Sequence, residues 1–390
     1  MDRREPLYYQ IYRDLRERIE NSEYPEGAQV PTESELEKEY GVSRITSKRA
    51  LAQLAREGFI ERIPGRGSFV LPRRRWARDD DGEASGHDRS VIGFVTQGVG
   101  ASYGTQLLVG VERAAREAEL GLMVRFTEGD PAAEEDAIRE FVELGCSGVV
   151  LFPVNGELYS PSLLQAYLSG LPVVLVDRFF PGLDIPSVSS DNRRAAYIGV
   201  NHLLDLGHTN VLLLSPRPHN TVSVEERIEG FFEAFTERNL LIDHSLILDD
   251  LTTNLPGVSQ RESYERDVAR IAEVLRQRPD VTGVMALEYN LAVAARTAAE
   301  RTGLSVPGDL SILCFDHPPW TLNTEPLFTH LRQDEEKMGR LAVEILLDLT
   351  KGDKARDNGV GTRRVHLPVE LVQGTTTAPA PAKSRKVQSV

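Results

Sequence analysis

Two groups of basic residues near the amino terminus have the types and spacing that suit contact with DNA. The first is Ser43-Arg44-Ile45-Thr46-Ser47-Lys48-Arg49-Ala50-Leu51, and the second is Pro64-Gly65-Arg66-Gly67. An arginine fork can meet both hydrogen-bond acceptors of a guanine in the major groove, and glycines let the backbone approach a phosphate or the minor groove closely. The residues that we expect to contact DNA are Arg44, Thr46, Lys48, Arg49, Gly65, Arg66 and Gly67.

The surrounding pattern predicts the elements that hold these groups. Apolar residues spaced by four predict a helix from Pro6 onward, and Thr32-Glu33-Ser34-Glu35 is a capping box that starts a second helix. Gly41 supplies a tight turn, and we expect Ser43 to cap the third helix. Two strands joined by the Pro-Gly-Arg-Gly turn follow. Residues 1–72 therefore read as a winged helix-turn-helix, mainly α-helical.

Short motifs along residues 6–71 support this interpretation. They are Pro31 with the capping box, Val42-Ser43-Arg44-x-Thr46, Ala50-Leu51-x-x-Leu54, Gly58-Phe59-Ile60 and Gly65-x-Gly67. The pattern resembles the GntR family of bacterial transcription regulators. The resemblance implies DNA contacts at Arg44, Thr46, Lys48 and the wing-tip glycines. Lys48 stands where the family usually has arginine, so we assign it to the DNA backbone rather than to base reading.

The composition indicates a globular chain of two or three domains. Of the 390 residues, 41% are hydrophobic and 27% are charged. Residues 1–75 hold 15 Lys and Arg against 13 Asp and Glu, so the net charge of −14 comes from the rest of the chain. Two separated cysteines argue against a disulfide framework or a cysteine-based metal site. The amino terminus is polar and no apolar run approaches the ~18 residues of a membrane span, so we expect a cytoplasmic protein without membrane contact.

From Val91 onward, short apolar runs alternate with helical patterns. This alternation predicts an α/β fold with parallel sheets covered by helices on both faces. We expect a two-lobed domain over residues 91–374, with lobes at 91–188 and 189–331. Segments 334–357 and 358–374 should then return to the first and second lobes. We expect a flexible linker at 73–90 and a disordered tail at 375–390.

Polar and aromatic residues follow several of the predicted strands. In open α/β sheets, ligands bind beyond the carboxyl ends of the strands. The residues at these ends are Thr96-Gln97, Phe126-Thr127-Glu128, Phe152-Pro153, Asp177-Arg178, Glu288-Tyr289 and Asp316-His317. With Tyr103, Phe179 and Trp320 added, they predict a pocket that stacks on and hydrogen-bonds a polar ligand.

A longer set of motifs covers residues 91–374. It includes Val91-Ile92-Gly93-Phe94-Val95, Pro172 to Arg178, Val188-Ser189-Ser190-Asp191-Asn192, His202-Leu203-Leu204-x-x-Gly207-His208, Arg227-x-x-Gly230-Phe231, Gly303 to Ser311 and Leu331-Arg332-Gln333. The set resembles the effector domain of the LacI/GalR family, which is similar in fold to periplasmic sugar-binding proteins. A GntR-type head on such a sensor looks like the arabinose-operon repressor architecture, although no residue implies arabinose itself.

The resemblance implies effector contacts from Tyr103, Asp177, Arg227, Asp316 and Gln333. The complete set of residues that we expect to bind the effector is Tyr103, Phe152, Asp177, Arg178, Arg227, Glu288, Asp316 and Gln333. Glu288-Tyr289 stands where the family often has Asn-Asp, so the effector can differ from common sugars.

These observations predict a DNA-binding transcriptional regulator and not an enzyme. We expect a homodimeric repressor of a double-stranded operator, released by a small carbohydrate effector, with no cofactor or metal; His202 and His208 should be caps or surface residues. One alternative is an NAD(H)-sensing redox regulator, because Gly98-x-Gly100-x-x-x-Gly104 follows a strand and Glu128 ends the next one. A second is an enzyme with catalytic carboxylates, although no nucleophile elbow, phosphate loop with lysine or metal-ligand cluster is found.

Overall fold

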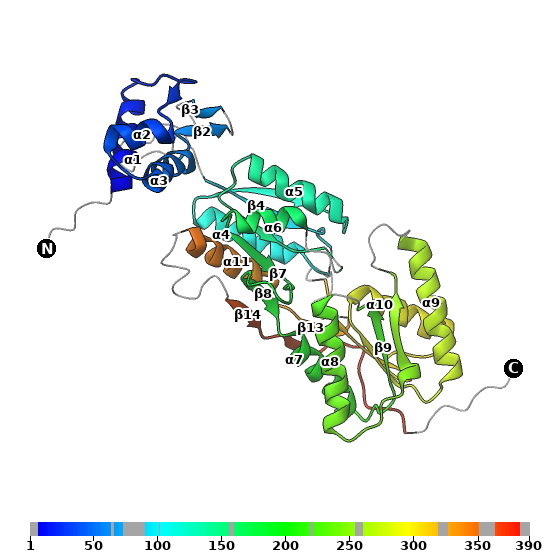
Figure 1. Ribbon diagram of the computed structural model, residues 1–390. Helices are drawn as coiled ribbons and strands as arrows, with labels where there is room; N and C mark the ends of the chain where they lie inside the picture. The colour runs from blue at the N-terminus through cyan, green and yellow to red at the C-terminus, as the bar shows by residue number, and fades with distance from the viewer. Residues whose placement is uncertain are drawn as a thin grey trace. The chain divides into compact units, whose positions relative to one another are not determined.

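The computed structural model describes residues 7–63, 66–72, 90–100, 102–154, 156, 160–218, 221–253, 260–318, 327–350 and 363–382. The chain forms two compact units, Met1–His87 and Asp88–Val390 (Figure 1). Of the expected linker at 73–90, all but Ser90 lies outside the described residues. Within the described ranges, no helix combines the length and apolarity that a membrane crossing needs.

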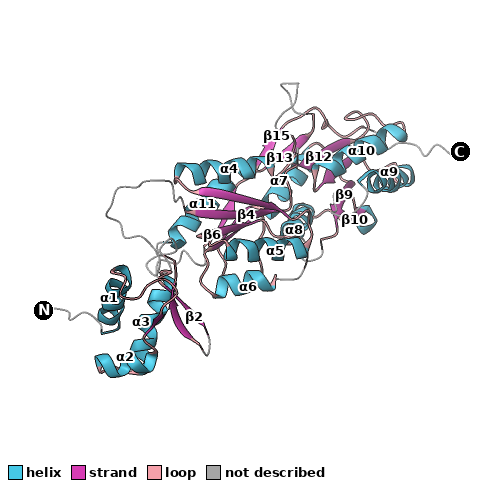
Figure 2. Cartoon of the chain, turned by 90° about the horizontal axis from the view of Figure 1, so that it is seen from above, coloured by secondary structure: helices cyan, strands magenta, loops and turns pink. Residues whose placement is uncertain are grey.

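The amino-terminal unit is a winged helix-turn-helix, as predicted. Its helices are α1 (Leu7–Glu20), α2 (Glu33–Tyr40) and α3 (Arg44–Arg56), and its strands are β1 (Gln29–Val30), β2 (Ile60–Ile63) and β3 (Gly67–Val70). The strands pair antiparallel in the order β1-β3-β2. Figure 2 shows β2 and its neighbour extending away from the helices as a two-stranded wing.

Local signals explain where the helices of this unit begin and end. The backbone N–H of Glu35 donates to Thr32 Oγ1 at 3.4 Å, and the N–H of Thr32 donates to Glu35 Oε2 at 2.8 Å, which confirms the capping box. Gly41 ends α2 with φ of 65°, in the left-handed region that favours glycine. Ser43 occupies the cap position of α3 but makes no side-chain cap bond. Its hydroxyl lies 3.0 Å from Thr46 Oγ1 instead, so Ser43 takes the predicted cap position without a side-chain bond to the helix backbone.

The second unit contains two parallel-sheet lobes. The first lobe has the strand order β14-β8-β7-β6-β4-β5, and the second has β10-β9-β11-β12-β13-β15, in which β15 alone of the described strands pairs antiparallel. The strands of the first lobe are β4 (Val91–Thr96), β5 (Gly121–Phe126), β6 (Gly148–Leu151), β7 (Val173–Val176), β8 (Ser187–Ser190) and β14 (Arg364–Leu367). Those of the second are β9 (Val211–Pro216), β10 (Ile247–Leu251), β11 (Gly283–Ala286), β12 (Ser311–Phe315), β13 (Thr329–Arg332) and β15 (Glu370–Val372).

Helices cover the faces of both sheets. The first lobe carries α4 (Thr105–Glu117), α5 (Pro131–Glu143), α6 (Pro161–Leu168) and α11 (Glu335–Thr350), and the second carries α7 (Asn192–Asp205), α8 (Val222–Glu237), α9 (Gln260–Gln277) and α10 (Tyr289–Arg301). Separate apolar clusters lie on the two faces of each sheet. Strands that are buried on both faces read as continuous apolar runs, which is why the sequence revealed most of them.

The described part of the chain crosses between the lobes three times. The crossings lie between β8 and α7, between β13 and α11, and between β14 and β15. As predicted, the segment that contains α11 returns to the first lobe, where it packs on α4. The prediction for 358–374 is wrong in part, because β14 pairs with β8 of the first lobe and only β15 joins the second. The edge of β8 offers free backbone groups, and β14 satisfies them.

The segment 375–382 is ordered against the second lobe, which corrects part of the predicted disordered tail. Thr376 Oγ1 donates to the carbonyl of Ile312 at 2.7 Å, and the N–H of Ala380 donates to the carbonyl of Leu206 at 2.8 Å. His208 is buried, with Nδ1 2.9 Å from Thr282 Oγ1 and Nε2 2.9 Å from the carbonyl of Ala378, so it is not a surface residue. Hydrogen bonds from threonine hydroxyls thus allow this polar segment to pack against the second lobe. Residues 383–390 lie outside the described residues.

We predict that a chain ending at Gly374 has a second lobe less stable by about 2–4 kcal/mol, because several hydrogen bonds of about 0.5–1.5 kcal/mol each are lost and buried partners are left unpaired. Urea unfolding followed by circular dichroism measures this difference. A chain ending at Ala382 is the control and should match the full-length protein. Equal midpoints for all three chains would show that the segment contributes nothing.

Candidate nucleic-acid interface and effector cleft

Helix α3 buries one side and presents its basic residues on the other. Ser47, Ala50, Leu51 and Leu54 are at most 1% exposed, which confirms the predicted apolar stripe. Because a helix places residues three and four apart on one face, this burial leaves Arg44, Lys48 and Arg49 exposed. Helix-turn-helix proteins use the start of the corresponding helix to read base edges.

Arg44 lies beside a groove of about 710 Å³ that α2, the start of α3 and the wing strands line together. Its Nε is 3.2 Å from Glu33 Oε2, while Arg62 Nη2 on β2 is 2.6 Å from Glu33 Oε1. The Arg44 side chain is 78% exposed, and ion pairs at such sites contribute little to stability. Glu33 therefore orients Arg44 without holding it strongly.

The other predicted DNA contacts are placed differently. The guanidinium of Arg49 lies 4.1 Å from the ring centre of Tyr8, so α1 orients this side chain. Arg66 is exposed at the wing, and Gly67 has φ of 120°, which only glycine adopts readily. Thr46 is half-buried near the start of α3. Gly65 lies outside the described residues.

All eight predicted effector residues line one cleft of about 200 Å³ in the second unit. Tyr103, Phe152, Asp177 and Arg178 come from the first lobe, Arg227, Glu288 and Asp316 from the second, and Gln333 from the crossing between β13 and α11. The cleft lies where the carboxyl ends of the strands of both lobes meet. Residues separated by more than 200 positions thus share one site.

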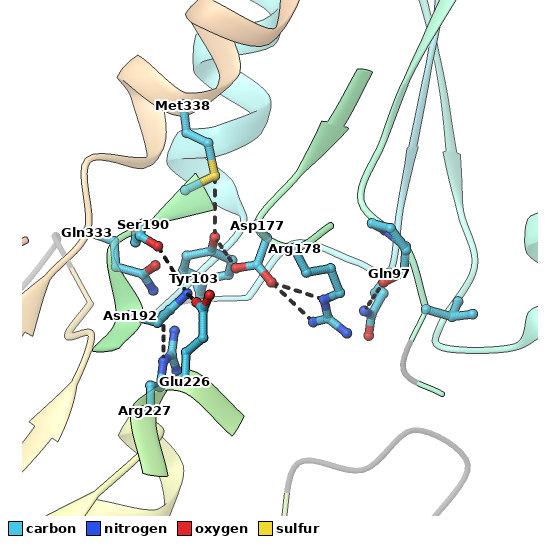
Figure 3. Close-up of polar contacts among 12 residues, drawn as sticks. Gln97, Tyr103, Asp177, Arg178, Ser190, Asn192, Glu226, Arg227, Gln333 and Met338 are labelled. Atoms are coloured by element: carbon cyan, nitrogen blue, oxygen red, sulfur yellow. Dashed lines mark hydrogen bonds and ion pairs between the residues drawn. The ribbon is translucent and has the colours of Figure 1, made fainter. Parts of the chain in front are cut away.

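The first-lobe wall is a hydrogen-bonded group (Figure 3). The hydroxyl of Tyr103 donates to Asp177 Oδ1 at 2.6 Å, and Arg178 lies 3.2 Å from Asp177 Oδ2. The guanidinium of Arg178 lies 5.0 Å from the ring centre of Phe152, which meets Tyr103 edge-on at 6.0 Å. The wall therefore presents an aromatic surface next to a fixed carboxylate.

Arg227 is fixed in the second-lobe wall from three directions. Its Nε donates to Asn192 Oδ1 at 2.8 Å, and its Nη1 donates to the carbonyl of Leu287 at 2.8 Å. Its guanidinium lies 3.9 Å from the ring centre of Phe315. The residue is 6% exposed, so the arginine is held within the lobe and not on a helix surface.

Gln333 leaves one polar atom without a partner. Its Nε2 lies 3.1 Å from both carboxylate oxygens of Asp316. Its Oε1 is buried and has no hydrogen-bond partner among the described residues. A buried acceptor without a donor costs about 1–3 kcal/mol, so this atom suits a ligand that brings a hydroxyl or N–H group.

The two cleft aspartates share an unusual backbone conformation. Asp177 follows β7 with φ of 70°, and Asp316 follows β12 with φ of 62°. A non-glycine residue in this left-handed region costs roughly 1–2 kcal/mol, and such strain concentrates at functional sites. The same turn at the end of one strand in each lobe directs two carboxylates to the same cleft.

Burial raises the pKa values of several acids in and beneath the cleft. It raises the pKa of Asp316 to about 7, although the charge of Arg227 and the hydrogen bond from Gln333 oppose the shift. Burial and the charge of Asp316 raise the pKa of Glu335 to about 8. Burial also raises the pKa of the Tyr103 hydroxyl well above its ordinary value.

Glu335 also contacts the end of the glycine-rich loop that had suggested a dinucleotide-binding site. Its Oε2 accepts from the backbone N–H of Gly104 at 2.7 Å and lies 3.4 Å from that of Leu107. A dinucleotide fold places a pyrophosphate at the amino end of this first helix. Here a carboxylate of the chain occupies the amino end of α4, so the loop does not offer that site.

Several residues that were predicted at strand ends do not line the cleft. Phe126 is 50% exposed on β5, and β5 is the edge strand of its sheet, which keeps the Phe126–Glu128 segment away. Phe179 packs on His366 and Arg364. Trp320 lies outside the described residues. Among the described residues, no three His, Cys, Asp or Glu side chains are grouped as a metal site requires.

Other residues line the cleft without having been predicted as site residues. They are Gln97, Ser102, Pro216, Arg217, Thr221, Ser223, Val224 and Tyr289. Gln97 and Tyr289 stand at strand ends that the sequence had marked. Pro216 ends β9, Arg217 and Thr221 lie between that strand and α8, and Ser223 and Val224 lie in the first turn of α8, so the same strand-end rule also covers this group. Asn192 belongs to a motif that carried the family resemblance, but its contact with Arg227 could not be read from the sequence.

We predict that Asp316→Asn gains stability relative to the natural protein as the pH rises from about 4 to about 7. The folded pKa of Asp316 lies above its unfolded value, so the fold favours the neutral acid and loses stability as that acid ionises. Asparagine does not ionise, and the difference should reach about 4 kcal/mol and stay constant above about pH 8. Urea unfolding at a series of pH values measures it. A difference that does not vary with pH would contradict the prediction.

Both units of the chain are similar to known protein families. Residues 7–70 match the family model of bacterial regulatory proteins of the gntR family, and residues 200–377 match that of the periplasmic binding protein-like domain. The chain is 25% identical over 350 residues to the arabinose metabolism transcriptional repressor of Geobacillus stearothermophilus, covering 88% of this chain and 91% of the relative. It is 31% identical over 259 residues to the HTH-type transcriptional regulator MalR of Streptomyces coelicolor, covering 65% and 71%.

Solved structures show the same fold. Transcription regulator CcpA of Lactococcus lactis superposes with a TM-score of 0.63 at 25% identity, covering 74% of this chain and 99% of that one. A LacI family transcriptional regulator from Enterococcus faecium with bound ribose superposes with a TM-score of 0.60 at 21% identity, covering 75% and 100%. The chain belongs to the bacterial transcriptional regulators that join a gntR-family DNA-binding domain to a periplasmic binding protein-like sensor domain.

Proposed function

We propose that this regulator binds an operator as a homodimer and releases it when a neutral sugar occupies the cleft between the lobes. The observation that carries the proposal is the convergence of strand ends from both lobes on one polar cleft with an unpartnered acceptor. Relatives named for arabinose and ribose metabolism support a sugar as the ligand class.

The charges that line the cleft favour a neutral polyol. Among the described lining residues, Arg178, Arg217 and Arg227 oppose Asp177, Glu288 and Asp316, so the formal charges cancel. Paired carboxylates and guanidiniums can each bind neighbouring hydroxyls, and Phe152 offers an apolar face for the ring carbons. Because these opposite charges balance, the cleft offers no net attraction to a phosphorylated or strongly acidic ligand.

The lobes supply a mechanism for release. A ligand that contacts both lobes binds the closed arrangement more tightly and shifts the population toward it by that difference in affinity. The second unit of each subunit would hold its partner, chiefly through the first lobe. Two DNA-binding units must then match half-sites about one DNA turn apart (~34 Å), and closure changes that match.

The proposal can be tested with an operator selected from random duplexes by the full-length protein. Its affinity is then measured with and without each member of a panel: arabinose, ribose, maltose, a sugar phosphate and NADH. We expect one neutral sugar to weaken operator binding at least tenfold. A response to NADH alone, or to no member of the panel, would reject the proposed effector class.

We predict that Arg44→Ala lowers the affinity for the selected operator by about 1–3 kcal/mol and relaxes base preference at one position of each half-site. Lys48→Ala should weaken binding to specific and random duplexes alike and reduce the salt dependence, because it removes a phosphate contact. Fluorescence anisotropy on both duplexes measures the difference. If Arg44→Ala binds the operator as tightly as the natural protein, the assignment of α3 to the major groove is wrong.

We predict that Arg227→Ala abolishes the sugar response while the operator affinity without sugar stays within about threefold. The variant removes a fixed donor from the cleft and leaves buried partners unmatched. Arg238→Ala is the matched control, because Arg238 ends the same helix and pairs with Asn201 and Asp205 away from the cleft. A normal response from Arg227→Ala would remove Arg227 from the site.

A further inference from the structure

Asn192 uses both halves of its side-chain amide within one buried network. It is 1% exposed and is the first residue of α7. Its Oδ1 accepts from Arg227 Nε at 2.8 Å, and its Nδ2 lies 3.2 Å from the carbonyl of Ser190 and 3.4 Å from Glu226 Oε2. Figure 3 shows these groups as one chain of contacts that leads from the cleft arginine to Ser190.

The contacts of Asn192 lead from the second lobe to the first. Ser190 is the last residue of β8 in the first lobe, and Arg227 lies on α8 in the second. Asn192 lies on the crossing between them. The other anchors of Arg227, Leu287 and Phe315, both belong to the second lobe. The contact through Asn192 therefore connects the cleft arginine to the strand of the opposite lobe.

The two helices that carry this contact, α7 and α8, pack closely against each other. A Cβ atom on Gly230 of α8 would lie 2.1 Å from the backbone oxygen of Arg193 on α7. Real Cβ atoms do not approach that closely, so glycine is required at this contact. Helix α8, which carries Arg227, and helix α7, which begins with Asn192, are therefore in close backbone contact.

We propose that Asn192 is a positioning residue with two roles. Its side-chain oxygen holds Arg227 in place for the effector, and its amide N–H groups couple effector binding to the end of β8. The inference rests on the proposed function and adds the path from the cleft to the crossing. A merely structural asparagine would support folding without affecting how effector binding and operator release are related.

The two halves of the amide can be separated by substitution. Asn192→Asp keeps an acceptor for Arg227 and strengthens it with charge, but it cannot donate to Ser190 or to Glu226 and places its carboxylate beside that of Glu226. Asn192→Ala removes both contacts. Asn201→Asp and Asn201→Ala are matched controls, because Asn201 lies on the same helix, accepts from Arg238 Nε at 2.7 Å and donates to the carbonyl of Tyr197 at 3.0 Å, away from the cleft.

The first measurement compares effector affinity with operator release in the full-length protein, using the panel sugar that releases the operator. We expect Asn192→Asp to reduce the maximal release at least tenfold while sugar affinity changes by less than about threefold. Asn192→Ala should lose at least tenfold in sugar affinity as well, and the Asn201 variants should lose neither. Equal losses of affinity and release in Asn192→Asp, or full release, would overturn the coupling role.

The second measurement needs no effector. It therefore tests the positioning role even if no sugar releases the operator and the proposed function is rejected. Urea unfolding of Asn192→Ala, Arg227→Ala and the double variant forms a double-mutant cycle. We expect the unfolding equilibrium constant of the double variant to depart at least tenfold from the product of the single effects, and the exposed pair Asn201 and Arg238 to depart less than threefold. Independent effects at Asn192 and Arg227 would overturn the positioning role. If Asn192→Ala does not fold, Asn192→Ser completes the same cycle.

Discussion

The structure depends on charged side chains that two lobes bury jointly in one cleft. A buried arginine or carboxylate is tolerated only where partners satisfy it. Arg227 and Asp177 have such partners, whereas Gln333 keeps an unpartnered oxygen and Asp316 ionises only with difficulty. The charged groups named here therefore have partners within the cleft, whereas one hydrogen-bond acceptor, Gln333 Oε1, has none among the described residues. The proposed sugar would supply a hydroxyl donor for the unpartnered oxygen of Gln333.

The crossings turn this local chemistry into a property of the whole sensor. Gln333 lies on one crossing and Asn192 on another, so a ligand that contacts the cleft acts where the lobes are joined. In the DNA-binding unit, Arg44 is oriented by an exposed ion pair with Glu33 that DNA can replace. Strong burial in the cleft and weak restraint of Arg44 on α3 suit the proposed tasks, since the cleft would recognise one class of ligand and α3 would bind and release DNA.

Much of this arrangement could be predicted from the sequence, because it follows from local patterns. The capping box at Thr32, the buried stripe of α3 and the apolar strands all follow from spacing, and the strand-end rule led to the cleft. The partners of β14 and the packing of Thr376 could not be predicted, since both depend on which edges the fold leaves open. The strained backbone of Asp316 and the contacts of Asn192 arise only from tertiary structure.

The claim that a ligand closes the lobes can be tested by a distance measurement. Leu168 and Leu241 are 82% and 96% exposed, on the first and second lobes, and Cys146 and Cys314 are buried. Spin labels on Leu168→Cys and Leu241→Cys report the separation of the lobes by pulsed electron resonance. We expect the operator-releasing sugar to replace a broad distance distribution with a narrow, shifted one. An unchanged distribution in protein that has bound the sugar and released the operator would contradict it.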